Sequence, residues 1–400
     1  MGEWPEYIIK DIALTMADAP FGSNLKTKDY QSDGVLVIQG KNIQGRNCKW
    51  DDVRYVSREK FDSLKRHHAI LGALVFPKVG TIGKVGYLTH PKDEKYFLLS
   101  TNTMMLEVDP DIALTDFVFY YFLSPHVQRN IQNMSSSSVQ PVFNFTSLKH
   151  YPIFLPPLPE QKAIASVLSS LDDKIDLLHR QNKTLEAMAE TLFRQWFSGA
   201  DYSSSIASLI ELQNGYAFKG RDFQESGENR VLKIKNISGG VVDISSTDFI
   251  SGSVSDSIDG KFSIVEGDVL FAMTGAKIGK MGIIPRPESP LWLNQRVGLF
   301  KERYKGSRFL AYLHLDSEYG KDYIENTATG SAQPNISGTD IENCEFPSVS
   351  EELIITYSEQ LATLYGKVIF NLNQIHTLEK MRDTLLPKLM SGEIHVEAGH

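Results

Sequence analysis

Two stretches of this 400-residue chain repeat one pattern: Thr184–Gly199, TLEAMAETLFRQWFSG, and Thr377–Gly392, TLEKMRDTLLPKLMSG. The shared residues keep the same spacing, and the copies lie 193 residues apart in the printed numbering. Gln140-Pro141 returns as Gln333-Pro334 at the same offset. This period is too long for a solenoid, whose repeats run roughly 20–50 residues. We therefore predict a duplicated domain, each copy a larger module followed by a long helix, related by a pseudo-twofold axis.

The composition is that of an ordinary soluble globular protein, with 42% hydrophobic and 22% charged residues. The length suits two to three domains, each able to bury its own core. No apolar run approaches the roughly 20 residues that a membrane span needs, and the start resembles no signal peptide. Cys48 and Cys344 lie at unrelated places in the two halves, which argues against a disulfide framework or a zinc cluster. We expect a cytoplasmic protein.

The net charge of -8 is unusual for a protein that binds phosphates. Its distribution matters more, because residues 1–155 hold 17 basic against 16 acidic residues, while residues 201–347 hold 15 against 20. The first module is near neutral, and a basic face within it remains compatible with this total. Charge alone therefore neither supports nor excludes a nucleic-acid partner.

Both predicted long helices carry apolar residues in alternating steps of three and four, the heptad seam of a coiled coil. The first begins after three prolines, Pro156, Pro157 and Pro159. About 40 residues make a rod of roughly 60 Å. The first seam runs Ile164, Leu168, Leu171, Ile175, Leu178, Asn182, Leu185, Ala189, Leu192, Trp196, and the second Tyr357, Leu361, Leu364, Val368, Asn371, Ile375, Leu378, Arg382, Leu385, Leu389.

One Asn lies in the middle of each seam. If the helices pack antiparallel with Asn182 opposite Asn371, facing positions have numbers that sum to 553, and nearly every layer is apolar on both sides. Leu171 opposite Arg382 is the exception, where the arginine must reach solvent or find a partner. We hypothesise that the two Asn form a buried pair that fixes the register. The alternative is that both lie at the wet edge of the seam.

The larger modules predict an α+β fold. Each has four strands rich in β-branched and aromatic residues, one helix, a polar loop and a last strand. The helices are predicted at 116–134 and 307–324. The strands are predicted at 35–43, 73–80, 84–89 and 103–108 in the first module, and at 231–237, 268–275, 280–285 and 295–300 in the second.

Three kinds of loop recur in both modules. The glycine-lysine turns Lys78–Lys84 and Thr274–Lys280 lack the Ser or Thr of a P-loop, but as turns between strands they can offer amides and lysines to a phosphate. The polar loops Ser135–Pro141 and Thr329–Asn335 supply hydroxyls and amides that can bond base edges or phosphates. Solvated turns without a ligand are the alternative for both. In a third kind, Pro20–Ser23 and Gly215–Lys219, an aromatic residue lies beside glycine. We expect these rings to pack locally, and insertion into a nucleic-acid groove is the alternative.

Motifs of enzymes are largely missing. The sequence has no Walker A motif, no glycine-rich nucleotide or S-adenosylmethionine fingerprint, no Asn/Asp-Pro-Pro-aromatic tetrapeptide and no HExxH. Pro91–Lys95 is similar to a nuclease carboxylate-lysine run but lacks a second matched acid and a counterpart in the other half. We predict no catalytic residue and no metal site.

The whole chain resembles a specificity (S) subunit of a type I restriction-modification system. The resemblance is carried by LPPLPEQ at Leu155–Gln161, by Thr184–Glu186 and Thr191–Phe193, and by LLPKLMSGEI at Leu385–Ile394. Phe346–Glu352 departs from the pattern, since FPSVSEE lacks the double proline and the glutamine at the start of the second helix.

The resemblance implies a non-catalytic subunit that reads a bipartite, asymmetric DNA site. Residues 1–155 and 201–347 would be target-recognition domains, and residues 156–200 and 348–400 a central and a C-terminal spacer helix. The implied partners are double-stranded DNA, two modification (methyltransferase) subunits that methylate adenine, and restriction (ATP-dependent translocase/nuclease) subunits. S-adenosylmethionine, ATP and Mg would then belong to the partner subunits, with no cofactor in this chain.

The predicted DNA contacts are the polar and cationic residues of the recurring loops. They are Ser23, Lys26, Lys41, Asn42, Lys78, Thr81, Lys84, Ser138, Gln140, Lys219, Lys235, Asn236, Thr274, Lys277, Lys280, Ser331, Gln333 and Asn335. Two other interpretations stay open: a stand-alone DNA-binding or scaffold protein that self-associates through its coiled coil, and a fused methyltransferase or nuclease.

Overall fold

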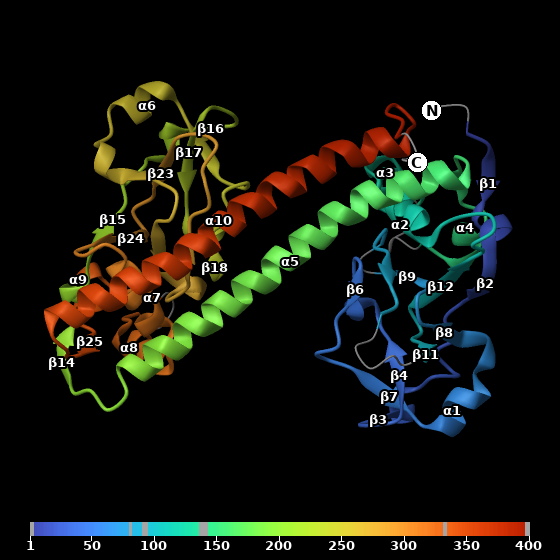
Figure 1. The fold of residues 1–400 in the computed structure, drawn as a ribbon, viewed down its shortest axis with the longest axis horizontal. Helices are drawn as coiled ribbons and strands as arrows, with labels where there is room; N and C mark the ends of the chain where they lie inside the picture. The colour runs from blue at the N-terminus through green and yellow to red at the C-terminus, as the bar shows by residue number, and fades with distance from the viewer. Residues whose placement is uncertain (1–3, 80–81, 90–94, 136–142, 331–333, 397–400) are drawn as a thin grey trace. The chain divides into compact units, whose positions relative to one another are not determined.

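The computed structural model describes residues 4–79, 82–89, 95–135, 143–330 and 334–396. They form two compact units, one of residues 1–174 with 378–400 and the other of residues 175–377. The long helices α5 (Leu158–Trp196) and α10 (Glu351–Met390) each contribute to both units (Figure 1). The four segments predicted from the sequence divide the chain differently and stay a prediction of its domain organisation.

In unit 1, two sheets and a helical layer make the module. The first sheet has the antiparallel order β10-β9-β12-β2, and the second the order β3-β7-β4-β11-β8, in which β4 and β11 run parallel. The first sheet comprises β2 (Ala13–Ala17), β9 (Leu74–Pro77), β10 (Gly86–Tyr87) and β12 (Thr103–Val108). The second comprises β3 (Tyr30–Gln31), β4 (Val35–Ile38), β7 (Arg54–Val56), β8 (His68–Ile70) and β11 (Tyr96–Leu99).

Unit 2 repeats this design. Its sheets have the orders β15-β24-β21-β22-β18 and β16-β19-β17-β23-β20, and β17 and β23 are again parallel. The first comprises β15 (Ile210–Asn214), β18 (Gly240–Val241), β21 (Val269–Ala272), β22 (Met281–Ile283) and β24 (Val297–Glu302). The second comprises β16 (Phe223–Gln224), β17 (Asn229–Leu232), β19 (Asp248–Ile250), β20 (Ser263–Ile264) and β23 (Leu291–Leu293). The predicted α+β class and the duplication are confirmed.

A two-stranded sheet joins the start and the end of each module. In unit 1, β1 (Glu6–Ile8) pairs with β13 (Pro152–Phe154). In unit 2, β14 (Tyr202–Ser205) pairs with β25 (Glu345–Pro347). Each module therefore closes on itself directly before its chain enters a long helix.

The single helix predicted over 116–134, and that over 307–324, is wrong, because each stretch forms two helices. In unit 1, α2 (Thr115–Leu123) and α3 (Pro125–Ser135) meet at Ser124. Proline disfavours a helical conformation in the residue before it and lacks the amide that would continue the ladder. In unit 2, α7 (Ser307–Asp316) and α8 (Glu318–Thr327) meet at Ser317, whose side chain caps α8 by accepting from the Gly320 amide. The second break has a capping residue and no proline.

These helices carry the apolar core that each module shares with the long helices. In unit 1 the core includes Phe117 and Tyr120 of α2, Ile164 and Leu168 of α5, and Leu389 of α10. Figure 1 shows α2 and α3 between the sheets of this unit and its long helices. The α2–α3 layer, which forms the base of the module, therefore packs against the long helices through buried apolar surface. Burial of such surface is the dominant favourable contribution to folding.

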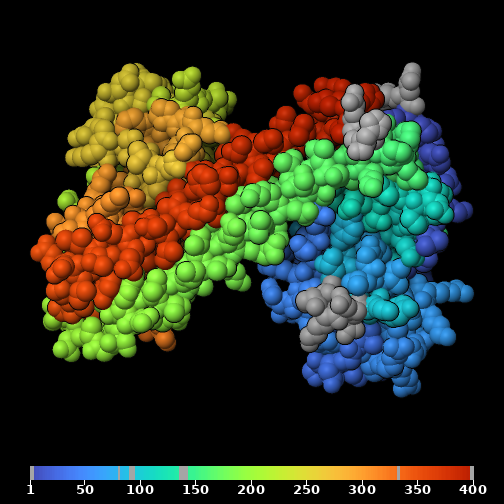
Figure 2. Space-filling model, viewed as in Figure 1, coloured from blue at the N-terminus to red at the C-terminus, as the bar shows by residue number. Residues whose placement is uncertain are grey.

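The long helices run antiparallel within each unit. In unit 2, Asn371 donates to Asn182 at 2.8 Å, and Trp196 stacks on Tyr357 with ring centroids 4.3 Å apart, a second pair whose numbers sum to 553. Figure 2 shows the two helices side by side in this unit. The predicted Asn contact is therefore present, both residues are buried, and their role in fixing the register stays a prediction.

Arg382 shows how the one mismatched layer is accommodated. In unit 1 its guanidinium donates to Asp172 at 3.0 Å and also pairs with Asp383. Tyr120 of α2 donates to the same Asp172 carboxylate at 2.7 Å. The arginine thus finds a partner at the helix interface, one of the two outcomes that the sequence left open.

Candidate nucleic-acid interface

The structure brings the glycine-lysine turn of each module beside the end of its polar loop. In unit 1 the Phe143 amide donates to the Lys78 carbonyl at 3.2 Å. In unit 2 the Ile336 amide donates to the Met273 carbonyl at 3.0 Å, and the Gly275 amide to the Pro334 carbonyl at 2.9 Å. Phe143 and Ile336 are 193 residues apart, so both copies make the same junction. In unit 2 the described ends of the two loops therefore lie side by side and form one edge of the module, here called the loop edge.

The amides of the second turn are mostly used inside the module. Those of Ile278 and Lys280 donate to the carbonyls of Gly275 and Lys277, and that of Gly279 donates to Ala272, at 2.9–3.0 Å. Gly275 and Gly279 adopt positive φ angles of 76° and 78°, which favour glycine. The hypothesis that this backbone cradles a phosphate is therefore wrong for these amides. In the first turn, Gly80 and Thr81 lie outside the described residues.

The lysines of the two turns differ in what holds them. Lys84 and Lys280 are exposed. Lys78 is half-buried and pairs with Asp18 at 2.8 Å. Lys277 donates to the Lys235 carbonyl at 2.7 Å and to the Ser238 hydroxyl at 3.0 Å, which ties its turn to a neighbouring loop. Lys84 and Lys280 are therefore the turn lysines best placed to meet a phosphate.

The predicted contacts Asn42 and Asn236 are corrected by the structure, because both are buried, at 2% and 1% exposure. Each accepts a backbone amide three residues earlier at 3.0 Å, from Gln39 and Lys233 respectively. Each side-chain amide also donates to a backbone carbonyl, at 2.9 Å and 3.2 Å. They shape the turns after β4 and β17 and present no side chain to a ligand.

The lysine before each asparagine is exposed and paired with a carboxylate. Lys41 pairs with Asp52, and Lys235 with Asp248 at 2.6 Å. Lys233 also reaches Asp248, at 2.5 Å. Burial of Asp248 favours its neutral form, but the two lysines outweigh this and lower its pKa below the ordinary value. The turn therefore holds two cations around one carboxylate.

Lys26 and Lys219 occupy equivalent positions 193 residues apart, and both side chains are exposed. Their backbone amides donate to Asp29 and Asp222 at 2.7 Å. The two aspartates cap these turns, and the Lys-x-x-Asp spacing, which recurs in both halves, is the sequence signal that marks them. Ser23 is also exposed, in the loop just before Lys26.

The polar loops are described only in part. Asn335 is exposed, and its backbone bridges to Thr274 and Thr329. Thr274 is buried at 2% exposure, so its predicted DNA contact is also corrected. The remaining predicted contacts lie outside the described residues: Thr81, Ser138, Gln140, Ser331 and Gln333.

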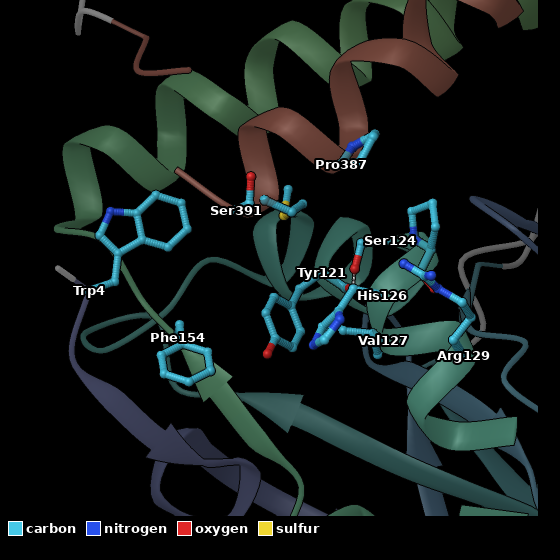
Figure 3. A pocket seen from close by; sticks show the side chains of 11 residues that line it. Trp4, Tyr121, Ser124, His126, Val127, Arg129, Phe154, Pro387 and Ser391 are labelled. Carbon is cyan, nitrogen blue, oxygen red and sulfur yellow. Dashed lines mark hydrogen bonds between the residues drawn. The ribbon is translucent and has the colours of Figure 1, made fainter. Parts of the chain in front are cut away.

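A small cavity opens in unit 1 between the α2–α3 turn and the end of α10 (Figure 3). It has a volume of about 90 Å³, and Trp4, Tyr121 and Phe154 line it together with the α2–α3 turn and the end of α10. In unit 2 the position equivalent to His126 is Tyr319, whose ring lies 4.8 Å from that of Tyr202. The second copy thus carries an aromatic contact at this place.

Among the described residues, no group of three or more His, Cys, Asp or Glu side chains is arranged to hold a metal ion. Within the same part of the chain, no helix is both long and apolar enough to cross a bilayer.

Comparison with known proteins decides the family. A family model described as the type I restriction modification DNA specificity domain matches residues 3–187 and 202–352. The chain belongs to this family. It is a DNA specificity subunit with one such domain in each half, which confirms the resemblance drawn from the LPPLPEQ and LLPKLMSGEI motifs.

Curated specificity subunits match over nearly the whole chain. The MjaIX type I specificity subunit of Methanocaldococcus jannaschii is 24% identical, with 99% of this chain and 94% of the relative covered. The HindI specificity subunit of Haemophilus influenzae is 21% identical, with 98% and 100% covered. The crystal structure of the S subunit from M. genitalium has a TM-score of 0.60 at 15% identity and covers 97% of this chain and 96% of its own, which supports the fold.

Proposed function

We propose that each module of this specificity subunit reads one half of a split, asymmetric DNA sequence and that the helix pair sets the gap between the halves. One observation carries the proposal: the specificity domain matches twice in one chain, and helices α5 and α10 each contribute to both compact units. Two readers on a stiff spacer must match the helical phase of two half-sites, as in dimeric DNA-binding proteins.

We expect the loop edge of each module to face DNA. Exposed Lys26, Lys84, Lys219 and Lys280 supply cations that can contact phosphates, which position a protein on the duplex. Exposed Asn335 has the amide chemistry that bonds base edges. This division between phosphate and base contacts rests on exposure and residue type.

The chemistry is proposed to belong to partner subunits. Two modification subunits would bind S-adenosylmethionine and methylate adenine, and restriction subunits would hydrolyse ATP with Mg to translocate and cut. The chain itself would act in the cytoplasm as a non-catalytic reader. In support, the specificity subunits that it resembles are named as parts of type I restriction enzymes.

The test is the native mass of the purified full-length chain, alone and mixed with the modification subunit of the same system. The proposal predicts a complex of one chain with two modification subunits. A chain that forms only homo-oligomers, or methyl transfer by the isolated chain with S-adenosylmethionine, would contradict it.

A further inference from the structure

An arginine in unit 1 joins the outer part of the first module to α5. Arg46 lies in the turn between β5 (Ile43–Gln44) and β6 (Asn47–Cys48), after Gly45 at φ +61°. Its guanidinium pairs with Asp173 of α5 at 2.6 Å and donates to the Ser169 carbonyl at 3.3 Å. The hairpin belongs to the core between the two sheets, not to the apolar core against the helices. Arg46 thus ties a second layer of the module to the same helix.

Further polar contacts surround this bridge. Asp116 of α2 lies 3.9 Å from Arg46 and accepts from the Tyr87 hydroxyl. Tyr120 donates to Asp172 of α5, which also pairs with Arg382. The Asp172 and Arg382 side chains are 17% and 29% exposed, so water screens their pair less than an ordinary surface pair. Arg46 is 27% exposed but Asp173 is 71% exposed, so water screens the Arg46–Asp173 pair more strongly.

The duplication does not copy this cluster. In the second module the equivalent hairpin turn, residues 238–241, reads Ser-Gly-Gly-Val and has no cation. At the offset of 193, Asp172 becomes Tyr365 and Arg382 becomes Ala189, both buried in an apolar core. The second copy therefore has apolar packing at the places where unit 1 has Asp172 and Arg382.

The second module is tied to its helix by a different turn. Asn373 of α10 donates to Glu266, accepts from the Arg286 amide at 2.8 Å, and Arg286 pairs with Glu266 at 3.0 Å. Subtracting the repeat offset of 193 places Asn373 at the position of residue 180 in the first copy. This position lies seven residues after Asp173, the residue of α5 that pairs with Arg46. Seven residues are about 10 Å of helix. Each module thus has its own polar tie, at its own level of the helix.

We propose that Arg46 and Tyr120 are positioning residues that fix the angle of the first module on α5 and so make the protein selective for one gap between half-sites. The inference rests on the proposed function. One base pair more in the gap moves a half-site by about 3.4 Å and rotates it by about 35°. A module that contacts α5 through both its apolar core and Arg46 cannot move to meet the shifted half-site. A module that contacts the helix only through its apolar core can tilt to meet it.

The experiment measures affinities of the full-length chain for DNA with its preferred gap and with gaps one base pair shorter and longer. Arg46→Ala and Tyr120→Phe are compared with wild type, and Tyr120→Phe removes one hydroxyl while keeping the buried ring. We expect the preference for the native gap to fall about tenfold while the preferred bases stay the same. Arg66→Ala, which removes an exposed cation of the same module, is the matched control and should keep the preference.

A charge exchange separates positioning from general stability. Arg46→Asp combined with Asp173→Arg should restore the gap preference that Arg46→Asp alone loses. Spin labels at Asp51 and Lys162, attached without cysteine chemistry, should show a broader distance distribution in Arg46→Ala than in wild type. An unchanged gap preference and an unchanged distribution in both single variants would overturn the inference. If the wild-type chain binds no split site while Arg46→Ala still broadens the distance distribution, the proposed function is overturned instead.

Discussion

At the scale of single residues, the Asp172 carboxylate holds Arg382 at the helix interface and also accepts from the Tyr120 hydroxyl. The heptad pattern predicts the mismatch at this layer but not the residues that accommodate it. Asn42 and Asn236 have the chemistry of base-reading amides, yet both are consumed by backbone groups of their own turns. Sequence spacing does not reveal these backbone hydrogen bonds. An asparagine that caps a turn and one that faces a ligand differ only in the groups that surround the side chain in the folded protein.

His314 makes a testable contribution to the pH dependence of stability. Burial lowers its pKa to about 4, and its Nε2 lies 2.8 Å from the Glu345 carbonyl. In the unfolded chain the imidazole takes up a proton near pH 6.5. The unfolded state therefore binds more protons between pH 6.5 and 4, so this contribution is fully present above pH 6.5 and is lost as the pH falls toward 4.

The loss is expected to reach at most about 3 kcal/mol. Denaturant unfolding at pH 7.5, 6, 5 and 4 should give a smaller decrease for His314→Phe than for wild type. His179→Gln, at an exposed site on α5, should keep the wild-type decrease. Equal slopes for wild type and His314→Phe would show that this histidine is not buried in its neutral form.

At the scale of elements, the heptad seam predicts both long helices and the alignment of their facing layers. The strands at 73–80, 103–108, 268–275 and 295–300 also form, as β9, β12, β21 and β24. The helices inside the modules are less well predicted, because apolar residues continue across the breaks at Ser124 and Ser317. Proline marks the first break, whereas only the capping geometry of Ser317 marks the second.

The buried Asn182–Asn371 pair is expected to fix the alignment of α5 with α10 and to make unit 2 less stable than an apolar layer would. The Oδ1 atom of Asn371 is buried and has no hydrogen-bond partner among the described residues, so the pair is only partly satisfied. Replacing both residues by leucine makes the layer apolar and should leave unit 2 as stable or more stable. Asn182→Leu alone removes the closer acceptor of the Asn371 amide, at 2.8 Å, and leaves only Gln181 at 3.4 Å, which should cost about 1–3 kcal/mol.

Chemical denaturation of the two variants tests this, with Lys183→Leu, at an exposed neighbouring site, as the control. The single variant should unfold at lower denaturant than the double variant. Unfolding of the single variant at the same or higher denaturant than the double variant would show that the two amides do not depend on each other.

At the scale of the whole molecule, the proposed function requires two readers and a helical spacer of defined length between them. Inserting a copy of Ile175–Gln181 before Ile175 and a copy of Leu372–Leu378 after Leu378 keeps the seam in register and both polar ties intact. The added heptad lengthens the rod by about 10 Å. The preferred gap should lengthen by up to about three base pairs, with unchanged half-site bases.

Selection of bound sequences from DNA with randomised gaps measures this directly. Insertion into α5 alone breaks the alignment of the helices and should abolish the single gap preference rather than shift it. An unchanged gap with the paired insertion would refute the role of the helices as a spacer.

The central claim is that this chain supplies two independent readers to a methylating complex. Its most direct test is methylome sequencing of a host that carries the complete system, with the wild-type chain and with a variant in which Lys280 and Asn335 of the second module are both replaced by alanine. The account predicts adenine methylation at a split, asymmetric sequence, and a variant that weakens or relaxes one half while the other half and the gap persist. Methylation at one continuous sequence, or loss of specificity in both halves together, would contradict it.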